Sequence, residues 1–191
     1  MYLERILADC AFGDHNVVFY SNSTALDQLL IKYCRKSIEE SNEILLLLTY
    51  HNSMESILDT LEDMEIDTKI QQKDGSLVIR DSAKACFNPV DELVDITIMI
   101  KMLLQRMKKL NKFGLTVISD MGIFFHRKRI FDLICHESRL SLGSTLSSVN
   151  GNKIRMLCCY QIADFASVTE RQKQQIFNTH SKVLSYEDVY K

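Results

Sequence analysis

The sequence predicts an α/β fold with a mostly parallel central sheet and helices on both faces. Short apolar runs alternate along the chain with longer segments of helical periodicity, which is the order of elements in a parallel sheet. The runs are apolar at consecutive positions, as strands buried on both faces are. No linker-like or highly charged block interrupts the 191 residues, so we expect one domain over residues 1–191.

Five apolar runs predict the strands, because runs of about four to eight apolar residues between polar ones are typical of buried strands. They cover residues 15–20, 43–50, 76–80, 115–119 and 154–160. Crossovers between parallel strands are right-handed. We expect the first strand to lie near the middle of the sheet.

Five further segments predict helices, at residues 24–40, 52–64, 89–110, 127–138 and 169–179. Residues 21–23 are Ser, Asn and Ser, which supply an N-cap for the first of them. Asn52 followed by Glu55 has the spacing of a capping box, and Pro89 suits the first turn of a helix. The small and polar residues 140–152 predict a loop before the last strand.

The six glycines exclude the two standard nucleotide-binding loops. They stand at positions 13, 75, 114, 122, 143 and 151, and no two have the spacing of GxxxxGK[ST] or GxGxxG. A phosphate group would find neither a cradle of backbone N–H groups nor the loop lysine. We therefore expect no tight Mg-ATP binding and no ATPase activity.

The charge and the apolar pattern bear on partners and location. A net charge of -2 gives no global field that would attract nucleic acid or anionic lipid. No apolar run approaches the ~20 residues of a membrane span, and the first residues lack the pattern of a signal peptide. We expect a cytoplasmic protein with no direct nucleic-acid partner and no membrane partner.

The six cysteines indicate neither a disulfide framework nor a metal centre. They form no CxxC pair, and the chain has no HExxH motif and no paired Cys/His set. Cys135, His136 and Glu137 are consecutive, so they cannot converge on one ion from a helix. We expect no metal and no cofactor, with the cysteines acting as small core residues.

Polar residues near the predicted strand ends form an ordered series of motifs. These are Gly13-Asp14-His15 with Phe19-Tyr20, Ser119-Asp120-Met121-Gly122, Cys135 to Leu140 with Glu137 inside it, Cys158-Cys159-Tyr160 with Phe165, and Thr179-His180 with Val183. In this order, and over nearly the whole chain, they resemble the MEDS domain, the methanogen/methylotroph DcmR sensory domain. The chain departs from that pattern at Gln161, where an acidic residue is usual, and at Ser181, where proline is usual.

The resemblance implies a sensory domain that binds a small organic ligand. It also implies a degenerate relative of the RecA/KaiC-type ATPases, with an α/β fold but without a P-loop. The turn at residues 20–24 agrees, since it contains no glycine and no lysine. The signal is then expected to pass to a separate signalling or regulatory protein, and a homo-oligomer is compatible with this role.

Ligands of open parallel sheets bind beyond the carboxyl ends of the strands. We therefore expect the polar residues of the resemblance to line one cavity at that edge: His15, Tyr20, Asp120, Glu137, Tyr160 and His180. We expect no catalytic residue, because no GxSxG elbow or comparable nucleophile pattern is present. Two alternatives stay open: an ATPase-like scaffold acting through protein–protein contacts, and a small hydrolase or isomerase using His15 and Asp120.

Overall fold

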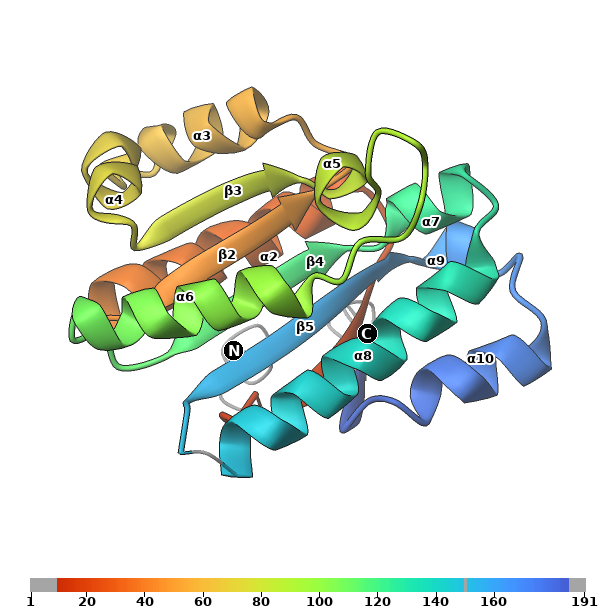
Figure 1. Cartoon of the computed structure of the whole chain (residues 1–191). Coiled ribbons are helices and arrows are strands. Elements are labelled where there is room, and N and C mark those ends of the chain that lie inside the picture. The colour runs from red at the N-terminus through yellow and green to blue at the C-terminus, as the bar shows by residue number, and fades with distance from the viewer. Residues whose placement is uncertain (1–9, 150, 186–191) are drawn as a thin grey trace.

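The computed structural model describes residues 10–149 and 151–185, and it confirms the α/β fold. Six strands form one parallel sheet in the order β3-β2-β4-β5-β1-β6 (Figure 1). They are β1 (His15–Tyr20), β2 (Ile44–Thr49), β3 (Leu77–Asp81), β4 (Leu115–Asp120), β5 (Ile154–Gln161) and β6 (Lys182–Ser185). All five predicted strands are present to within two residues at either end.

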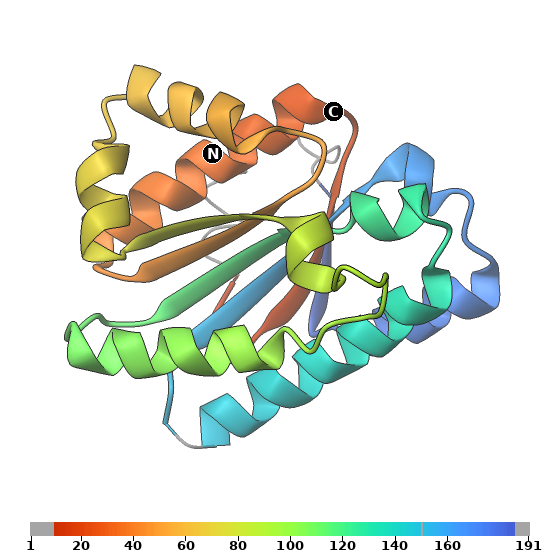
Figure 2. The same ribbon diagram turned by 45° about the horizontal axis from the view of Figure 1, so that its top comes forward.

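Helices cover both faces of the sheet. On one face lie α2 (Ser23–Cys34), its continuation as the π-helix η1 (Arg35–Glu40), α3 (Met54–Asp63) and α4 (Thr68–Asp74). On the other lie α6 (Thr97–Lys109), α8 (Ile130–Val149) and α10 (Glu170–Phe177), as Figure 2 shows for α6 and α8. The short helices α5 (Ser82–Cys86), α7 (Gly122–His126) and α9 (Ile162–Phe165) directly follow the carboxyl ends of β3, β4 and β5. No helix in the described ranges is long and apolar enough to cross a membrane.

The strands are apolar because both sheet faces are buried. All six residues of β2 are buried, and they contribute alternately to two cores. Leu46 and Leu48 belong to the core under α6 and α8, whereas Leu45 and Leu47 belong to the core under α2 and α3. Two residues of one strand therefore share a face only when their residue numbers differ by an even number.

The first strand is not near the middle of the sheet, so that expectation is wrong. In the described sheet β4 and β5 are central, and β1 lies between β5 and β6. The chain returns through α10 and adds β6 outside β1. The sequence does not predict β6, because this strand is only four residues long and begins with a lysine.

The helix expected from Pro89 begins only at Thr97. The Asn88 side chain accepts hydrogen bonds from the backbone N–H groups two and four residues later, which closes a turn there. Asp91 then has a φ of 62°, which no helix accommodates. The Asp95 carboxylate accepts a bond from the Thr97 N–H and marks the start of α6.

Two other helix boundaries differ from the expectation. The predicted loop at 140–152 is wrong over most of its length, because α8 continues to Val149. Its serines, threonine and glycine have low helix propensity, which hides the helix in the sequence. The N-cap of α3 is Ser53 rather than Asn52, whose side chain donates to Asp27 instead.

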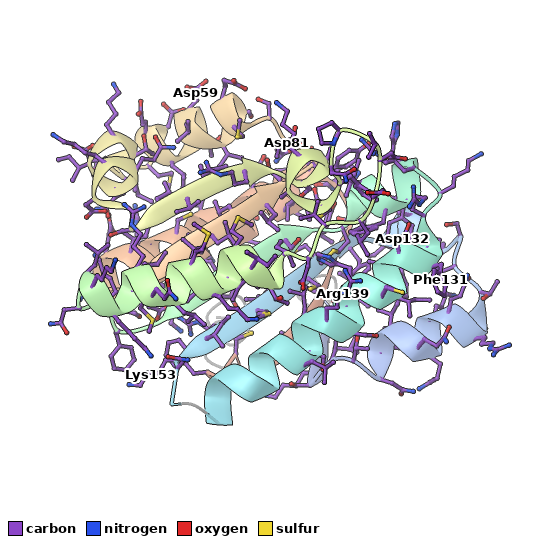
Figure 3. All side chains as sticks on the ribbon, viewed as in Figure 1. Asp59, Asp81, Phe131, Asp132, Arg139 and Lys153 are labelled. Carbon is purple, nitrogen blue, oxygen red and sulfur yellow. The ribbon has the colours of Figure 1, made fainter. Side chains whose placement is uncertain are left out.

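The sequence does not predict the short helices α4, α5, α7 and α9. They have only four to seven residues, which is too short for a helical pattern of apolar residues to be recognised. Asp81, labelled in Figure 3, ends β3 and is the N-cap of α5, because its side chain accepts a bond from the Lys84 N–H.

A buried ion pair joins the amino ends of β2, β4 and β5. Arg155 Nη2 donates to both carboxylate oxygens of Glu43, at 2.7 and 2.9 Å. Arg155 Nε donates to Thr116 Oγ1 at 2.9 Å, and Nη1 donates to the Cys10 carbonyl at 3.2 Å. The pair lies inside the molecule, so removal of one charge would leave the other buried without a counter-charge.

Replacing Glu43 by Gln is therefore expected to lower the free energy of unfolding by about 3–5 kcal/mol. The matched control is Glu39→Gln, because the ion pair between Glu39 and Arg35 is exposed. That change is expected to cost less than about 1 kcal/mol. Urea unfolding followed by circular dichroism measures both values, and equal losses would contradict the structural role of the buried pair.

Candidate functional site

The structure divides the six predicted site residues between the two faces of the sheet. His15, Glu137, Tyr160 and His180 converge on the face covered by α8 and α10. Tyr20 and Asp120 meet on the face covered by α2 and α3. The expectation that all six line one cavity at the carboxyl edge is therefore wrong: Tyr20 and Asp120 end their strands, but His15 begins β1. A ligand role for each residue stays a prediction.

We call the first group, completed by Cys158, the Glu137 cluster. His15 begins β1, and Cys158 and Tyr160 lie on the neighbouring strand β5, two residues apart and on one face. Glu137 comes from α8, and His180 from the turn between α10 and β6. The side chains of His15, Glu137 and His180 are at most 3% exposed, and Cys158 and Tyr160 are fully buried.

One carboxylate oxygen is the centre of this cluster. Glu137 Oε2 lies 3.1 Å from His15 Nε2, 3.3 Å from His180 Nε2 and 3.3 Å from the Cys158 thiol, which donates to it. Glu137 Oε1 accepts the Tyr160 hydroxyl. Four segments that are far apart in the sequence are therefore joined through one buried acid.

Burial and mutual contacts shift the acid–base properties of the cluster. Burial raises the pKa of Glu137, but the contacts with His180 and His15 outweigh it and hold that pKa well below its ordinary value. Burial lowers the pKa of His180, and Glu137 more than reverses this and raises it. Burial, together with the Glu137 charge, raises the pKa of Cys158 and of Tyr160. The acid is therefore ionised, and the thiol and the phenol are neutral.

Ser181 fixes the turn that carries His180. Its backbone N–H donates to the His15 carbonyl at 2.6 Å, and its hydroxyl accepts from the His15 N–H at 3.2 Å. A proline, which the family pattern has here, would lack the N–H that makes the first of these bonds. The departure from the pattern thus adds a bond between β1 and the start of β6.

Tyr20 and Asp120 belong to a second group, the Asp120 cluster, which includes His51. The Tyr20 hydroxyl donates to Asp120 Oδ1 at 3.2 Å and lies 2.9 Å from His51 Nδ1. His51 follows β2, and both its backbone N–H and its Nδ1 lie 3.0 Å from Asp120 Oδ2. The cluster is therefore built at the carboxyl ends of β1, β2 and β4.

Gly122 lies beside the Asp120 cluster, with the His51 ring packed against its backbone. The Gly122 N–H donates to Asp120 Oδ1 at 3.0 Å. A Cβ at position 122 would lie 2.2 Å from His51 Cε1, so a larger residue would force the His51 ring to move. The hydrogen bond to Asp120 raises the pKa of His51, although burial opposes it.

The hollows near the two clusters differ in size. The void beside Asp120 is about 10 Å³, room for one water molecule at most. A hollow of about 370 Å³ lies at the carboxyl edge on the other face, between β1, α9 and α10. Its lining includes Phe19, Phe165, Phe177 and Lys173. A larger hollow of about 770 Å³, along α2 and η1, is lined by neither cluster.

Two residues of the clusters, Cys158 and His51, are absent from the predicted site. The sequence predicts Cys158 to be a core residue, although its even spacing from Tyr160 places both side chains on one face. His51 follows the second strand, so the rule that ligands bind at strand ends could have included it. Only Glu137 of the consecutive trio Cys135-His136-Glu137 reaches its cluster; His136 is buried against Phe124.

Fold and site together define a class: an open parallel α/β domain without a phosphate-binding loop, with polar clusters near its strand ends. The family model of the MEDS domain, described as the methanogen/methylotroph DcmR sensory domain, matches residues 14–181. The chain belongs to this family, which confirms the resemblance. No curated protein matches the chain.

The raised pKa of His51 predicts a pH-dependent contribution to stability. The contribution is complete below the ordinary histidine pKa of about 6.5 and is lost as the pH rises through the higher value of the folded state. His51→Gln is therefore expected to destabilise the protein by about 1 kcal/mol near pH 5.5 and by less near pH 8.5. Urea unfolding at both pH values measures the difference.

The Asp120→Asn, Asp164→Asn double background supplies the control, because His51 has lost both of its carboxylate partners there. In that background His51→Gln should have the same effect at both pH values. A loss that does not depend on pH in the native background would contradict this assignment.

Proposed function

We propose that this sensory domain binds a small organic ligand in the aromatic hollow formed by Phe19, Phe165 and Phe177. Family membership supports the sensory role. The hollow supports the place of binding, because ligand sites are concave and mostly apolar with a few polar groups. A sensory role also requires an effector, which we place in a separate regulatory protein.

The walls of the hollow favour a small, largely apolar molecule with one polar end. The ring centroids of Phe19 and Phe165 are 4.8 Å apart, and those of Phe165 and Phe177 are 5.5 Å apart. Lys173 lines the same hollow, and its ammonium group is paired with Glu170 at 2.7 Å. The rings provide apolar contact and the ammonium group provides one polar contact, so an oxygenated ligand suits the site.

The Glu137 cluster lies directly beneath this hollow. The Tyr160 ring is 5.3 Å from Phe165 and 6.0 Å from Phe19, centroid to centroid, and its hydroxyl donates to Glu137. A ligand that moves either phenyl ring would therefore act on Tyr160. This contact is the observation that favours a link between the hollow and the buried polar residues.

Binding rather than catalysis is the proposed activity. Tyr20, His51 and Asp120 are the residues whose geometry best suits acid–base chemistry. The void beside Asp120, of about 10 Å³, leaves no room for an organic substrate. The domain is therefore proposed to be a receptor.

The proposal is tested by filling the hollow. Ala166 is exposed and lines it, whereas Ala163, on α9, is exposed and does not. We expect Ala166→Trp to abolish binding and Ala163→Trp to leave it unchanged. A thermal-shift screen with small alcohols, amines and carboxylates, together with native mass spectrometry for a retained compound, first identifies a ligand. Calorimetry then measures its affinity for both variants. Equal affinity of both variants would place the ligand elsewhere.

A further inference from the structure

We propose that His15 Nε2, Glu137 Oε2, Cys158 Sγ and His180 Nε2 bind one divalent transition-metal ion of the zinc class. These four atoms lie within 4.8 Å of one another, and all four residues are buried or nearly so. The inference does not depend on the aromatic hollow or on any ligand bound there. It goes against the expectation from the sequence, which considered only ligand spacings within short motifs.

The distances between the four donor atoms fit a tetrahedral ion. With Zn–N and Zn–O bonds of about 2.0–2.2 Å and a Zn–S bond of about 2.3 Å, neighbouring ligand atoms are about 3.3–3.6 Å apart. His15 Nε2 lies 3.1 Å from Glu137 Oε2 and 3.2 Å from Cys158 Sγ. Glu137 Oε2 lies 3.3 Å from both His180 Nε2 and Cys158 Sγ. All pairs among the four donor atoms lie within 4.8 Å, so binding of an ion would draw the four side chains closer together.

The backbone orients both imidazoles so that their Nε2 atoms face the carboxylate. His15 Nδ1 lies 3.0 Å from the Thr179 carbonyl, and His180 Nδ1 lies 2.7 Å from the Ile176 carbonyl. A carbonyl oxygen only accepts, so each Nδ1 carries the proton and donates it. Histidine ligands of metals are held in this way, with the second ring N–H on a carbonyl and the free nitrogen on the ion.

The Glu137 carboxylate is oriented too. Tyr160 donates to Glu137 Oε1, so Oε2 is the oxygen that faces the two histidines and the thiol. An unprotonated Nε2 turns its lone pair toward the lone pairs of Oε2, so either a proton on the imidazole or a metal ion must lie between the two atoms. His180 Nε2 has no aligned hydrogen bond among the described residues. A metal ion would bind all these lone pairs at once.

The donor set selects the class of ion. Two imidazoles, one thiolate and one carboxylate suit zinc and its neighbours rather than calcium or magnesium, which prefer oxygen. A divalent ion with one thiolate and one carboxylate forms a neutral site, which suits a buried position. Four protein ligands fill the coordination sphere, as in structural zinc sites, so the ion would stabilise rather than catalyse.

Such an ion would join β1, β5, α8 and the turn before β6 at one point. The turn carries His180 and lies three residues after α10, whose last residue Phe177 lines the aromatic hollow. Metal binding would therefore fix the part of the domain nearest to the proposed ligand.

Cobalt(II) is the probe, because a thiolate ligand gives it a near-ultraviolet charge-transfer band and a tetrahedral site gives it intense visible bands. The full chain, freed of metal by a chelator, is titrated with Co²⁺ and then with Zn²⁺ in competition. We expect one equivalent of Co²⁺ with both signals, and displacement by one equivalent of Zn²⁺. Cys158→Ser should remove the charge-transfer band and weaken Co²⁺ binding by at least about 100-fold, since even residues that only support ligands cost 10–100-fold.

Cys159→Ser is the matched control, because Cys159 is the next residue of β5, equally buried, and faces the opposite core. It should bind Co²⁺ as the unmodified chain does. His180→Gln gives a second ligand variant if Cys158→Ser does not fold. No stoichiometric binding by the folded, unmodified chain would overturn the proposal. Binding that both cysteine variants share unchanged would also overturn it, and the Glu137 cluster would then be a network of shared protons.

Discussion

The alternation of side chains along buried parallel strands is the constraint on which the structure depends. Each side chain of a strand points to one of the two faces of the sheet, and the buried apolar ones fill two separate cores, so each polar residue on a strand must find its partners on one face only. His15 and Tyr20 are five positions apart, which places them on opposite faces. Parallel pairing sets Tyr160 beside Phe19 rather than Tyr20. The two polar clusters and their separation follow from this geometry.

Most of the fold, but only part of the candidate site, can be predicted from the sequence. The apolar runs located all five long strands, because double-sided burial leaves a clear signal, whereas β6 and the shortest helices leave little. Four of the six expected residues converge, and the odd spacing of His15 and Tyr20 could have predicted that the set divides. Other features depend on three-dimensional packing. The rotation of α8 decides that Glu137 faces β5, and the strand order decides that Arg155 reaches Glu43.

Two of the buried acids, Glu43 and Glu137, are stabilised differently, and the difference bears on function. Glu43 faces a guanidinium whose three nitrogens each donate to an acceptor, which is typical of a structural pair. Glu137 faces no fixed cation: one of its oxygens is shared by two imidazoles and a thiol, groups that can each gain or lose a proton or bind a metal. Buried titratable groups with strongly shifted pKa values gather at functional sites. The Glu137 cluster therefore deserves a functional explanation that the Glu43 pair does not need.

Tyr160 is the point at which the proposed ligand would act on this cluster. Its ring packs against Phe19 and Phe165 at the base of the hollow, and its hydroxyl donates to Glu137. Aromatic rings are rigid, so a ring displaced by a ligand moves its neighbour instead of absorbing the change. A shift that breaks the hydroxyl bond leaves a buried carboxylate oxygen without a partner, at a cost of about 1–3 kcal/mol. Rearrangement of the other groups that contact Glu137, which are His15, Cys158 and His180, would relieve that cost. Of these, His180 belongs to the turn that leads into the edge strand β6. Ligand binding in the hollow would thus change the edge of the sheet, which is where a partner protein can detect it.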